Sequence, residues 1–154
     1  MRAFIVAAAA AVLVASAAGP AAATDASDVM TVINDYNAAL AKGDLKSAAA
    51  DCVAQLSIID EFAPHSWQGP RALAKWFDSY AVWAKQNAVT GGVIALSQPW
   101  HVEIDGDSAY AVVPATYTYA KSGSTVVESG SVWTFALRKT SSGWRIASWA
   151  WAEH

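Results

Sequence analysis

The stretch Leu56-Ser57-Ile58-Ile59-Asp60-Glu61-Phe62 sets the fold, because its residues alternate in the manner of a half-buried β-strand. Successive side chains of a strand point to opposite faces, so the even-numbered residues of this stretch share one face. That face is apolar except for Asp60. A carboxylate on the core side of a strand is costly unless it is paired, hydrated or neutral. Asp60 therefore has either a functional role or a local partner, such as the backbone N–H groups of the following loop.

The residues around this strand predict three helices followed by a series of strands. Helices are predicted over Thr24–Lys42, from Leu45 to about Asp51, and from Gly69-Pro70 to near Asn87, with an irregular connection over 63–68. Strands are predicted over 93–104, bent at Pro99, and over 108–120, 125–138 and 144–152, joined by tight turns. This order indicates an α+β fold in which three N-terminal helices pack on a strongly curved antiparallel sheet. The helices should cover the concave face and leave a cone-shaped roll with an internal pocket.

The N-terminus has the pattern of a secretory signal peptide. Met1-Arg2 is a short positive segment, residues 3–18 are small and apolar, and Ala21-Ala22-Ala23 fits a cleavage site. The apolar run is shorter than the ~20 residues that a spanning helix needs. We therefore predict a signal peptide over residues 1–23 and a single domain over 24–154, exported to the periplasm or secreted. Cleavage after Ala17 is the alternative. No second apolar run of spanning length follows, so no membrane association is expected after cleavage.

Charge and cysteine content exclude several classes of function. The formal net charge is −3 and the basic residues form no cluster, which argues against a nucleic-acid partner. Cys52 is the single cysteine, so no internal disulfide can form, and a buried thiol is expected. The histidines at positions 65, 101 and 154 are widely spaced, so no metal site and no cofactor are predicted.

Eight tryptophans are an unusual number for a domain of this size. Each indole N–H requires a partner when it is buried, so a core absorbs only part of such an excess. Aromatic side chains in this number are typical of a cavity that takes an apolar or planar ligand. We therefore expect a small apolar or aromatic molecule as the partner.

Three motifs resemble a known family. They are the segment from Tyr36 to Asp44, Asp60 followed by Gly69-Pro70-Arg71-Ala72-Leu73, and the closing Gly143-Trp144-Arg145-Ile146. With the element order, they make the chain similar to the nuclear-transport-factor-2-like (NTF2-like) superfamily, in its SnoaL-like or ketosteroid-isomerase-like branch. This resemblance implies the curved cone fold, and it implies a homodimer through the sheet, since the family often dimerises there. It does not imply one activity, because the fold carries enzymes and binding proteins alike.

The ketosteroid isomerases give the closest local match. Tyr36 stands where they carry a first-helix tyrosine, and Asp60 stands where they carry a general base, nine residues before Gly69. The late-strand acid of these enzymes falls at or near Trp133, and the third-helix tyrosine is replaced by Phe77. The resemblance thus supplies a base and one hydrogen-bond donor, and leaves the rest of the oxyanion site without a counterpart.

Three functions remain open from the sequence. The first is an exported small-molecule-binding domain with an aromatic-lined pocket. The second is a cofactor-independent isomerase, cyclase or dehydratase, in which Asp60 is a base of raised pKa and Tyr36 donates to the substrate. The third is a structural homodimerisation module. The ligand-binding residues that we predict are His65, Trp67, Trp76, Tyr80, Tyr117, Trp133, Phe135 and Trp149.

Overall fold

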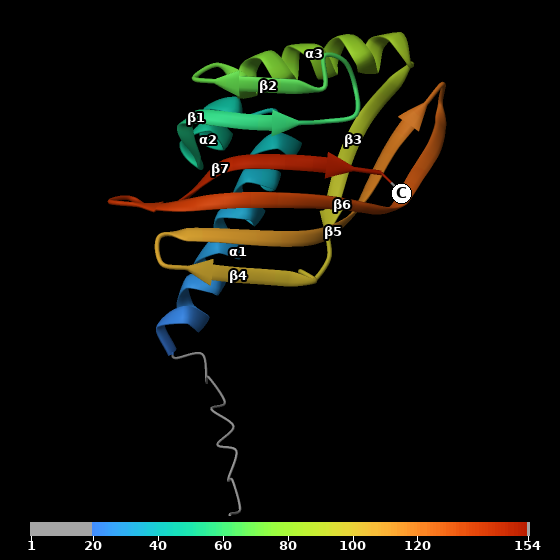
Figure 1. The fold of residues 1–154 in the computed structure, drawn as a ribbon. Helices are drawn as coiled ribbons and strands as arrows, with labels where there is room; N and C mark the ends of the chain where they lie inside the picture. The colour runs from blue at the N-terminus through green and yellow to red at the C-terminus, as the bar shows by residue number, and fades with distance from the viewer. Residues whose placement is uncertain (1–19, 154) are drawn as a thin grey trace, which may run out of the picture.

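The computed structural model describes residues 20–153, which form three helices and seven strands (Figure 1). The helices are α1 (Pro20–Ala41), α2 (Leu45–Ala50) and α3 (Ala72–Gln86). The strands are β1 (Cys52–Ile59), β2 (Ser66–Gly69), β3 (Val89–Leu96), β4 (His101–Asp105), β5 (Ser108–Lys121), β6 (Ser124–Thr140) and β7 (Gly143–Ala152). The predicted signal peptide lies mostly outside the described residues. Within residues 20–153, no helix is long and apolar enough to cross a membrane.

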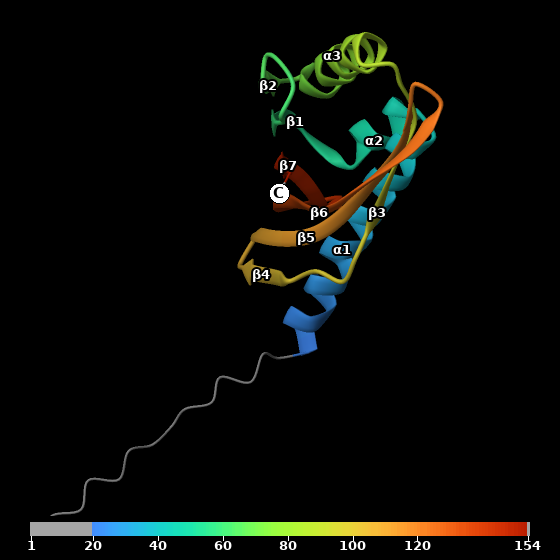
Figure 2. The same ribbon diagram turned by 90° about the vertical axis from the view of Figure 1, so that its right-hand side faces the viewer.

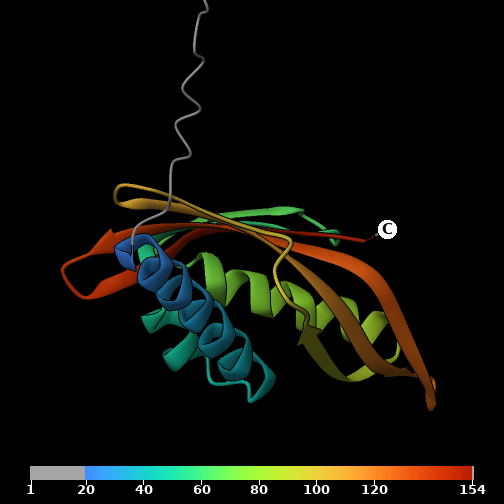
Figure 3. The same ribbon diagram turned by 90° about the horizontal axis from the view of Figure 1, so that it is seen from below.

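The predicted α+β architecture is confirmed. Figures 2 and 3 show a sheet that curves around α1 and α3, which lie together on its concave side. Helix α1 presents Val29, Ile33 and Tyr36 to the sheet, and all three are fully buried. Their spacing of four and three residues is the helical period that predicted this face. The helix begins at Pro20 rather than at Thr24, since proline is tolerated in a first turn and the alanines that follow favour a helix.

The predicted curved sheet is present, but it is mixed and not antiparallel throughout. Its strand order is β2-β1-β7-β6-β5-β3, and β4 also pairs with β5. Strands β1 and β7 pair in parallel, with Ile58 beside Trp149, while the other pairs are antiparallel. Tight turns fix the relative direction of successive strands only. Because β1 and β7 meet without a connecting turn, the sequence pattern held no information on their direction.

Two local predictions also need correction. Residues 63–68 were expected to be irregular, but residues 66–68 belong to the edge strand β2, in which Gln68 pairs with Ser57. This strand brings Trp67, which is 4% exposed, against the core. As a result, α3 begins at Ala72, slightly later than the predicted start at Gly69-Pro70. The strand predicted over 93–104 is divided into β3 and β4, both of which pair with β5, and the break lies around Pro99, where a bend was expected.

The alternation over residues 56–62 is confirmed. Leu56, Ile58, Asp60 and Phe62 are all buried, with exposed fractions of 3%, 0%, 8% and 7%, whereas Ile59 is 55% exposed. Asp60 itself lies just past the end of β1, yet it keeps the inward direction of the strand. The sheet therefore delivers this carboxylate to the concave side, between α3 and the central strands.

Candidate functional site

A cavity lies between α1, α3 and the concave face of the sheet. The space it encloses is about 750 Å³ when the open solvent at its mouth is included. More than half of its lining residues are aromatic: Phe62, Trp76, Phe77, Tyr80, Trp83, Tyr117, Trp133, Trp149 and Trp151. The others are Asn37, Leu40, Ala41, Asp60, Glu61, Gly92 and Ile94. An apolar cavity with a few polar groups suits an apolar or planar ligand.

Asp60 is fixed at the cavity wall by two short hydrogen bonds. The Trp76 indole Nε1–H donates to Oδ2 at 2.7 Å, and the backbone N–H of Glu61 donates to Oδ1 at 2.7 Å. The loop after β1 closes behind it, where the Asp60 N–H donates to the His65 carbonyl at 3.1 Å. Burial raises the pKa of Asp60, although the bonds from Trp76 and Glu61 and the nearby His65 oppose this shift. A carboxylate in this setting can accept a proton or a hydrogen bond from a ligand.

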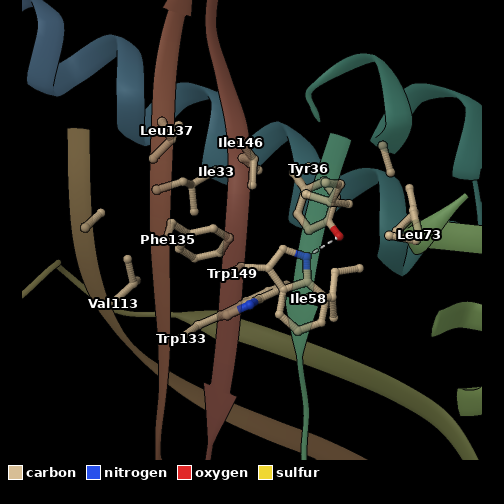
Figure 4. Close-up of a cluster of buried hydrophobic side chains, with 14 of the residues drawn as sticks. Ile33, Tyr36, Ile58, Leu73, Val113, Trp133, Phe135, Leu137, Ile146 and Trp149 are labelled. Carbon is tan, nitrogen blue, oxygen red and sulfur yellow. Dashed lines mark hydrogen bonds between the residues drawn. The ribbon is translucent and has the colours of Figure 1, made fainter. Parts of the chain in front are cut away.

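Tyr36 lies in the core, and it is not among the residues that line the cavity. Figure 4 shows its hydroxyl oxygen accepting a hydrogen bond from Trp149 Nε1–H, at 2.8 Å. Burial raises the pKa of Tyr36 well above its usual range. The structure therefore joins Tyr36 to Trp149, a cavity residue, and not directly to Asp60.

A pair of tyrosines links α3 to β5 across the cavity. The hydroxyls of Tyr80 and Tyr117 lie 2.6 Å apart, within hydrogen-bond distance. Burial and this contact raise the pKa of Tyr117. Gly92 on β3 makes the approach possible, because a Cβ atom built there would lie 2.8 Å from the Tyr80 hydroxyl. The backbone conformation of Gly92 is one that other residues also adopt, so the glycine is required only because a larger side chain would clash with the two tyrosines.

The structure brings six of the residues predicted for the site into the cavity wall: Asp60, Trp76, Tyr80, Tyr117, Trp133 and Trp149. The other four lie elsewhere. Phe135 is fully buried and packs on Trp133, with ring centroids 4.9 Å apart. The indole of Trp67 donates to Ser79 Oγ at 3.2 Å, and His65 is exposed in the loop beyond β1. Tyr36 is described above. Whether any of these residues binds or transforms a ligand stays a prediction.

Several lining residues were absent from the predicted site. Phe62 shares the face of Asp60, and Trp151 shares the face of Trp149, so the same alternation could have found both. Trp83 also lines the cavity from α3, and its place there depends on the tilt of that helix. For Gly92, the sequence contains no signal, since its role depends on side chains from two other elements.

Acidic residues gather beside the cavity. Glu61 lines it, and burial together with the nearby carboxylate of Glu153 raises the pKa of Glu61 to about 8. Burial and Glu128 likewise raise the pKa of Glu153. The hydroxyl of Tyr119 donates to Glu128, and this bond raises the pKa of Tyr119 to about 12. Among residues 20–153, no group of three or more His, Cys, Asp or Glu is arranged to hold a metal ion.

The comparison with protein families agrees with this geometry. The family model for the SnoaL-like domain matches residues 29–151, so the chain belongs to the SnoaL-like family, within the NTF2-like superfamily. The cavity described above is thus the internal cavity of a SnoaL-like domain with an aromatic cluster. A search of curated proteins found no significant match.

Solved structures share the same fold. An NTF2-like protein with a cystatin-like fold from Novosphingobium aromaticivorans is 20% identical, with a TM-score of 0.70 over 85% of this chain and 82% of that one. A protein of the NTF2-like family from Streptomyces avermitilis, named as a proposed dehydratase, is 17% identical, with a TM-score of 0.67 over 86% and 98%. The CaMKII hub of S. rosetta is 20% identical, with a TM-score of 0.70 over 90% and 99%. At such identities the likeness shows the fold alone.

Proposed function

We propose that this protein is an exported small-molecule-binding domain whose ligand is an apolar or aromatic compound. The observation that supports it is the cavity lined mainly by aromatic side chains. Its walls offer large apolar area, while Asp60, Asn37 and the tyrosine hydroxyls provide a small number of polar contacts. Such a combination is typical of sites that bind a mostly apolar molecule in one orientation.

Tryptophan fluorescence tests this proposal directly. Trp76, Trp83, Trp133, Trp149 and Trp151 line the cavity, so a bound ligand should shift or quench the emission. A panel of neutral and charged aromatic and alicyclic compounds would be titrated into the mature domain. The absence of any saturable response across the panel would contradict the proposal.

A matched pair of variants then locates the binding. Gly92→Val places a side chain against Tyr80 and Tyr117, and it should weaken binding by roughly tenfold or more because it fills the cavity. Ala95→Val adds a similar volume at an exposed position of the same strand and should leave binding within about twofold. Equal effects of the two variants would place the ligand elsewhere.

A cofactor-independent isomerase, cyclase or dehydratase is the second candidate. It is favoured by the raised pKa of Asp60 at the wall of an apolar cavity, the setting in which a carboxylate can serve as a general base. Proton abstraction would be followed by NMR, as exchange of deuterium from solvent into ligands that carry a C–H group next to a carbonyl. Asp60→Asn should slow this exchange by ~10²-fold or more. Asp78→Asn, on the exposed side of α3, is the control. Exchange that persists in Asp60→Asn would remove this candidate.

Export and homodimerisation complete the proposal. Export is supported by the signal-peptide pattern of residues 1–23, and fractionation of the producing cells would test it. Dimerisation is supported by the outer face of the sheet, where partly exposed residues of β5 and β6 are uncharged: Val112, Pro114, Thr116, Val132, Thr134 and Ala136. A monomer in sedimentation at micromolar concentration would exclude the dimer. If a dimer is found, Thr134→Arg should dissociate it.

A further inference from the structure

The cavity is unbalanced in charge. Among the described residues that line it, Asp60 and Glu61 are the ionisable acids, and no lysine, arginine or histidine is present. The two carboxylates are adjacent in the chain, and they lie on the loop that leaves β1. Asp60 is 8% exposed, so its charge is largely removed from bulk water. Nothing in the wall supplies the positive charge that two such groups would attract.

Further acids surround the same side of the cavity. Three carboxylates raise the pKa of Glu61 by their charge. They belong to Glu153 just after β7, Asp60 just after β1 and Glu128 on β6. The nearby carboxylate of Glu153 raises the pKa of Glu61, because two like charges at close range disfavour the ionised forms. In the absence of a counter-charge, these acids reduce their repulsion by retaining protons. A cation at this position would relieve the repulsion and would release a proton.

The aromatic walls lie next to these acids. The Trp76 indole that donates to Asp60 stacks on Tyr80, with ring centroids 5.9 Å apart and planes at 21°. Tyr80 stacks in turn on Trp83, at 5.9 Å and 30°. On the other side, Trp149 meets Trp76 edge to face at 5.2 Å. Aromatic faces attract cations, most strongly where water is excluded, and tryptophan is the best of the three aromatic side chains.

The unpartnered donor of Trp133 is a second feature that a ligand would explain. Trp133 lines the cavity and is 1% exposed, and its indole N–H has no hydrogen-bond partner within the described residues. A buried donor without an acceptor carries an unfavourable desolvation cost. An acceptor atom on a bound molecule would satisfy it. Apart from His65 in the loop behind Asp60, the cavity therefore has no basic side chain beside its acids, and it has no acceptor for Trp133.

From this geometry we infer that the ligand is an organic cation: an aromatic or alicyclic ring system that carries an ammonium group. The ammonium group lies beside Asp60 and Glu61, and the ring system lies against the aromatic walls of the cavity. The inference rests on the proposed small-molecule function and specifies its ligand class. An anionic ligand would face uncompensated repulsion in this cavity, and a neutral one would leave the acids without a counter-charge.

One ring with three head groups provides the test. The probes are naphthalen-2-ylmethyl-trimethylammonium, naphthalen-2-ylmethanol and naphthalene-2-carboxylate, titrated calorimetrically into the mature domain at pH 9. The cation should bind roughly tenfold more tightly than the alcohol, since a cation–π contact and two carboxylates act on it alone. The carboxylate probe should bind more weakly than the alcohol. The quaternary probe keeps its charge at every pH, so its pH dependence reports the protein alone.

Lowering the pH should weaken binding of the cation specifically. On acidification from pH 9, Glu61 takes up a proton as the pH passes about 8, because burial and the neighbouring carboxylates raise its pKa. Burial also raises the pKa of Asp60 and that of Glu153. Glu128, held by the Tyr119 hydroxyl, and His65 behind Asp60 are the other titratable groups that face this side. The ratio of the alcohol and cation dissociation constants should therefore fall several-fold on acidification.

Two substitutions, each of which removes one negative charge, separate attraction of the cation by the cavity acids from attraction by the net charge of the protein. Glu61→Gln, at an exposed residue of the cavity mouth, should reduce the preference for the cation over the alcohol by roughly threefold or more. Asp78→Asn also removes one negative charge but lies on the exposed side of α3, and it should leave this preference unchanged. Circular dichroism and thermal melts verify that both variants fold.

The possible outcomes distinguish this inference from the proposed function. Alcohol binding that equals or exceeds cation binding would overturn the inference and leave the proposed function standing. Tighter binding of the carboxylate probe would also overturn it. A cation preference that both variants lower equally would assign the preference to net charge and refute the placement beside Glu61. If none of the three probes binds, both the inference and the proposed function lose their support.

Discussion

The hydrogen bond between Trp149 and Tyr36 gives a quantitative prediction for Tyr36→Phe. The donor Nε1 and the acceptor hydroxyl are 2.8 Å apart, and the two residues are 3% and 0% exposed. Removing the hydroxyl leaves the Trp149 indole N–H buried without a partner. Such a group costs ~1–3 kcal/mol of unfolding free energy. For a domain of this size, each kcal/mol lowers the Tm by about 4 °C, so we expect a decrease of roughly 4–12 °C.

Thermal unfolding followed by circular dichroism would measure this decrease. Tyr110→Phe is the matched control, because Tyr110 is 44% exposed and loses the same atom to solvent. The control should change the free energy of unfolding by less than ~0.5 kcal/mol. Ligand binding by Tyr36→Phe should remain within about threefold of the unmodified protein, since Tyr36 does not line the cavity.

The opposite pattern would refute this reasoning. Tyr36→Phe and the Tyr110→Phe control could have the same Tm, while Tyr36→Phe lowers ligand affinity or turnover tenfold or more. In that case Tyr36 acts on the ligand rather than in the core. That result would support the donor role that the resemblance to ketosteroid isomerases implies. A large loss of both stability and binding would indicate that the bond positions Trp149 in the cavity wall.

Three further predictions follow from the charges and the packing. The pKa of Glu61 is raised to about 8 in the folded state, so the native protein holds an extra proton between about pH 4.5 and pH 8, and unfolding free energy should fall as pH rises through this window. Urea denaturation should show that Glu61→Gln removes part of that fall, and an unchanged slope would count against it. Hydrogen bonds from Lys139 and Trp144 lower the pKa of Asp25, so its stabilising effect should be present above about pH 4 and lost as pH falls further. Asp25→Asn should therefore lower the Tm at pH 7, and this effect should become smaller as the pH falls below about 4. Finally, Gly92→Val should lower the free energy of unfolding by about 1–3 kcal/mol, because the new side chain overpacks against Tyr80 and Tyr117. Urea denaturation would measure this decrease.

Local patterns predicted most of the secondary structure. The period of α1 followed from Val29, Ile33 and Tyr36, and the inward direction of Asp60 followed from two apolar neighbours of the same parity. Such predictions succeed because helix and strand periods are set by backbone geometry within a few residues. The strand β2 was missed, since a four-residue edge strand carries too little alternation to be distinguished from a loop.

Lining residues of the cavity were predicted only where the direction of a side chain from its own strand or helix was sufficient to place it. Trp149 and Trp133 were placed in the cavity correctly because strand alternation turned them to the concave face. Phe135 has the same parity as Trp133, yet it lies deeper in the core. Alternation chooses the face of a sheet but not the position along it, and the cavity occupies only one end of the concave face.

The sequence by itself determined the α+β order, the family and the presence of a carboxylate on an apolar face. These properties depend on the spacing of residues along the chain, because backbone geometry sets the face of a helix or strand to which each side chain points. The tertiary structure alone decided which aromatic residues meet around Asp60, that Tyr36 pairs with Trp149 across 113 residues, and that β1 runs parallel to β7. It also decided that Glu61 meets the acids of distant strands. Such contacts depend on sheet curvature and helix tilt, which arise from the packing of the whole chain and from no single segment.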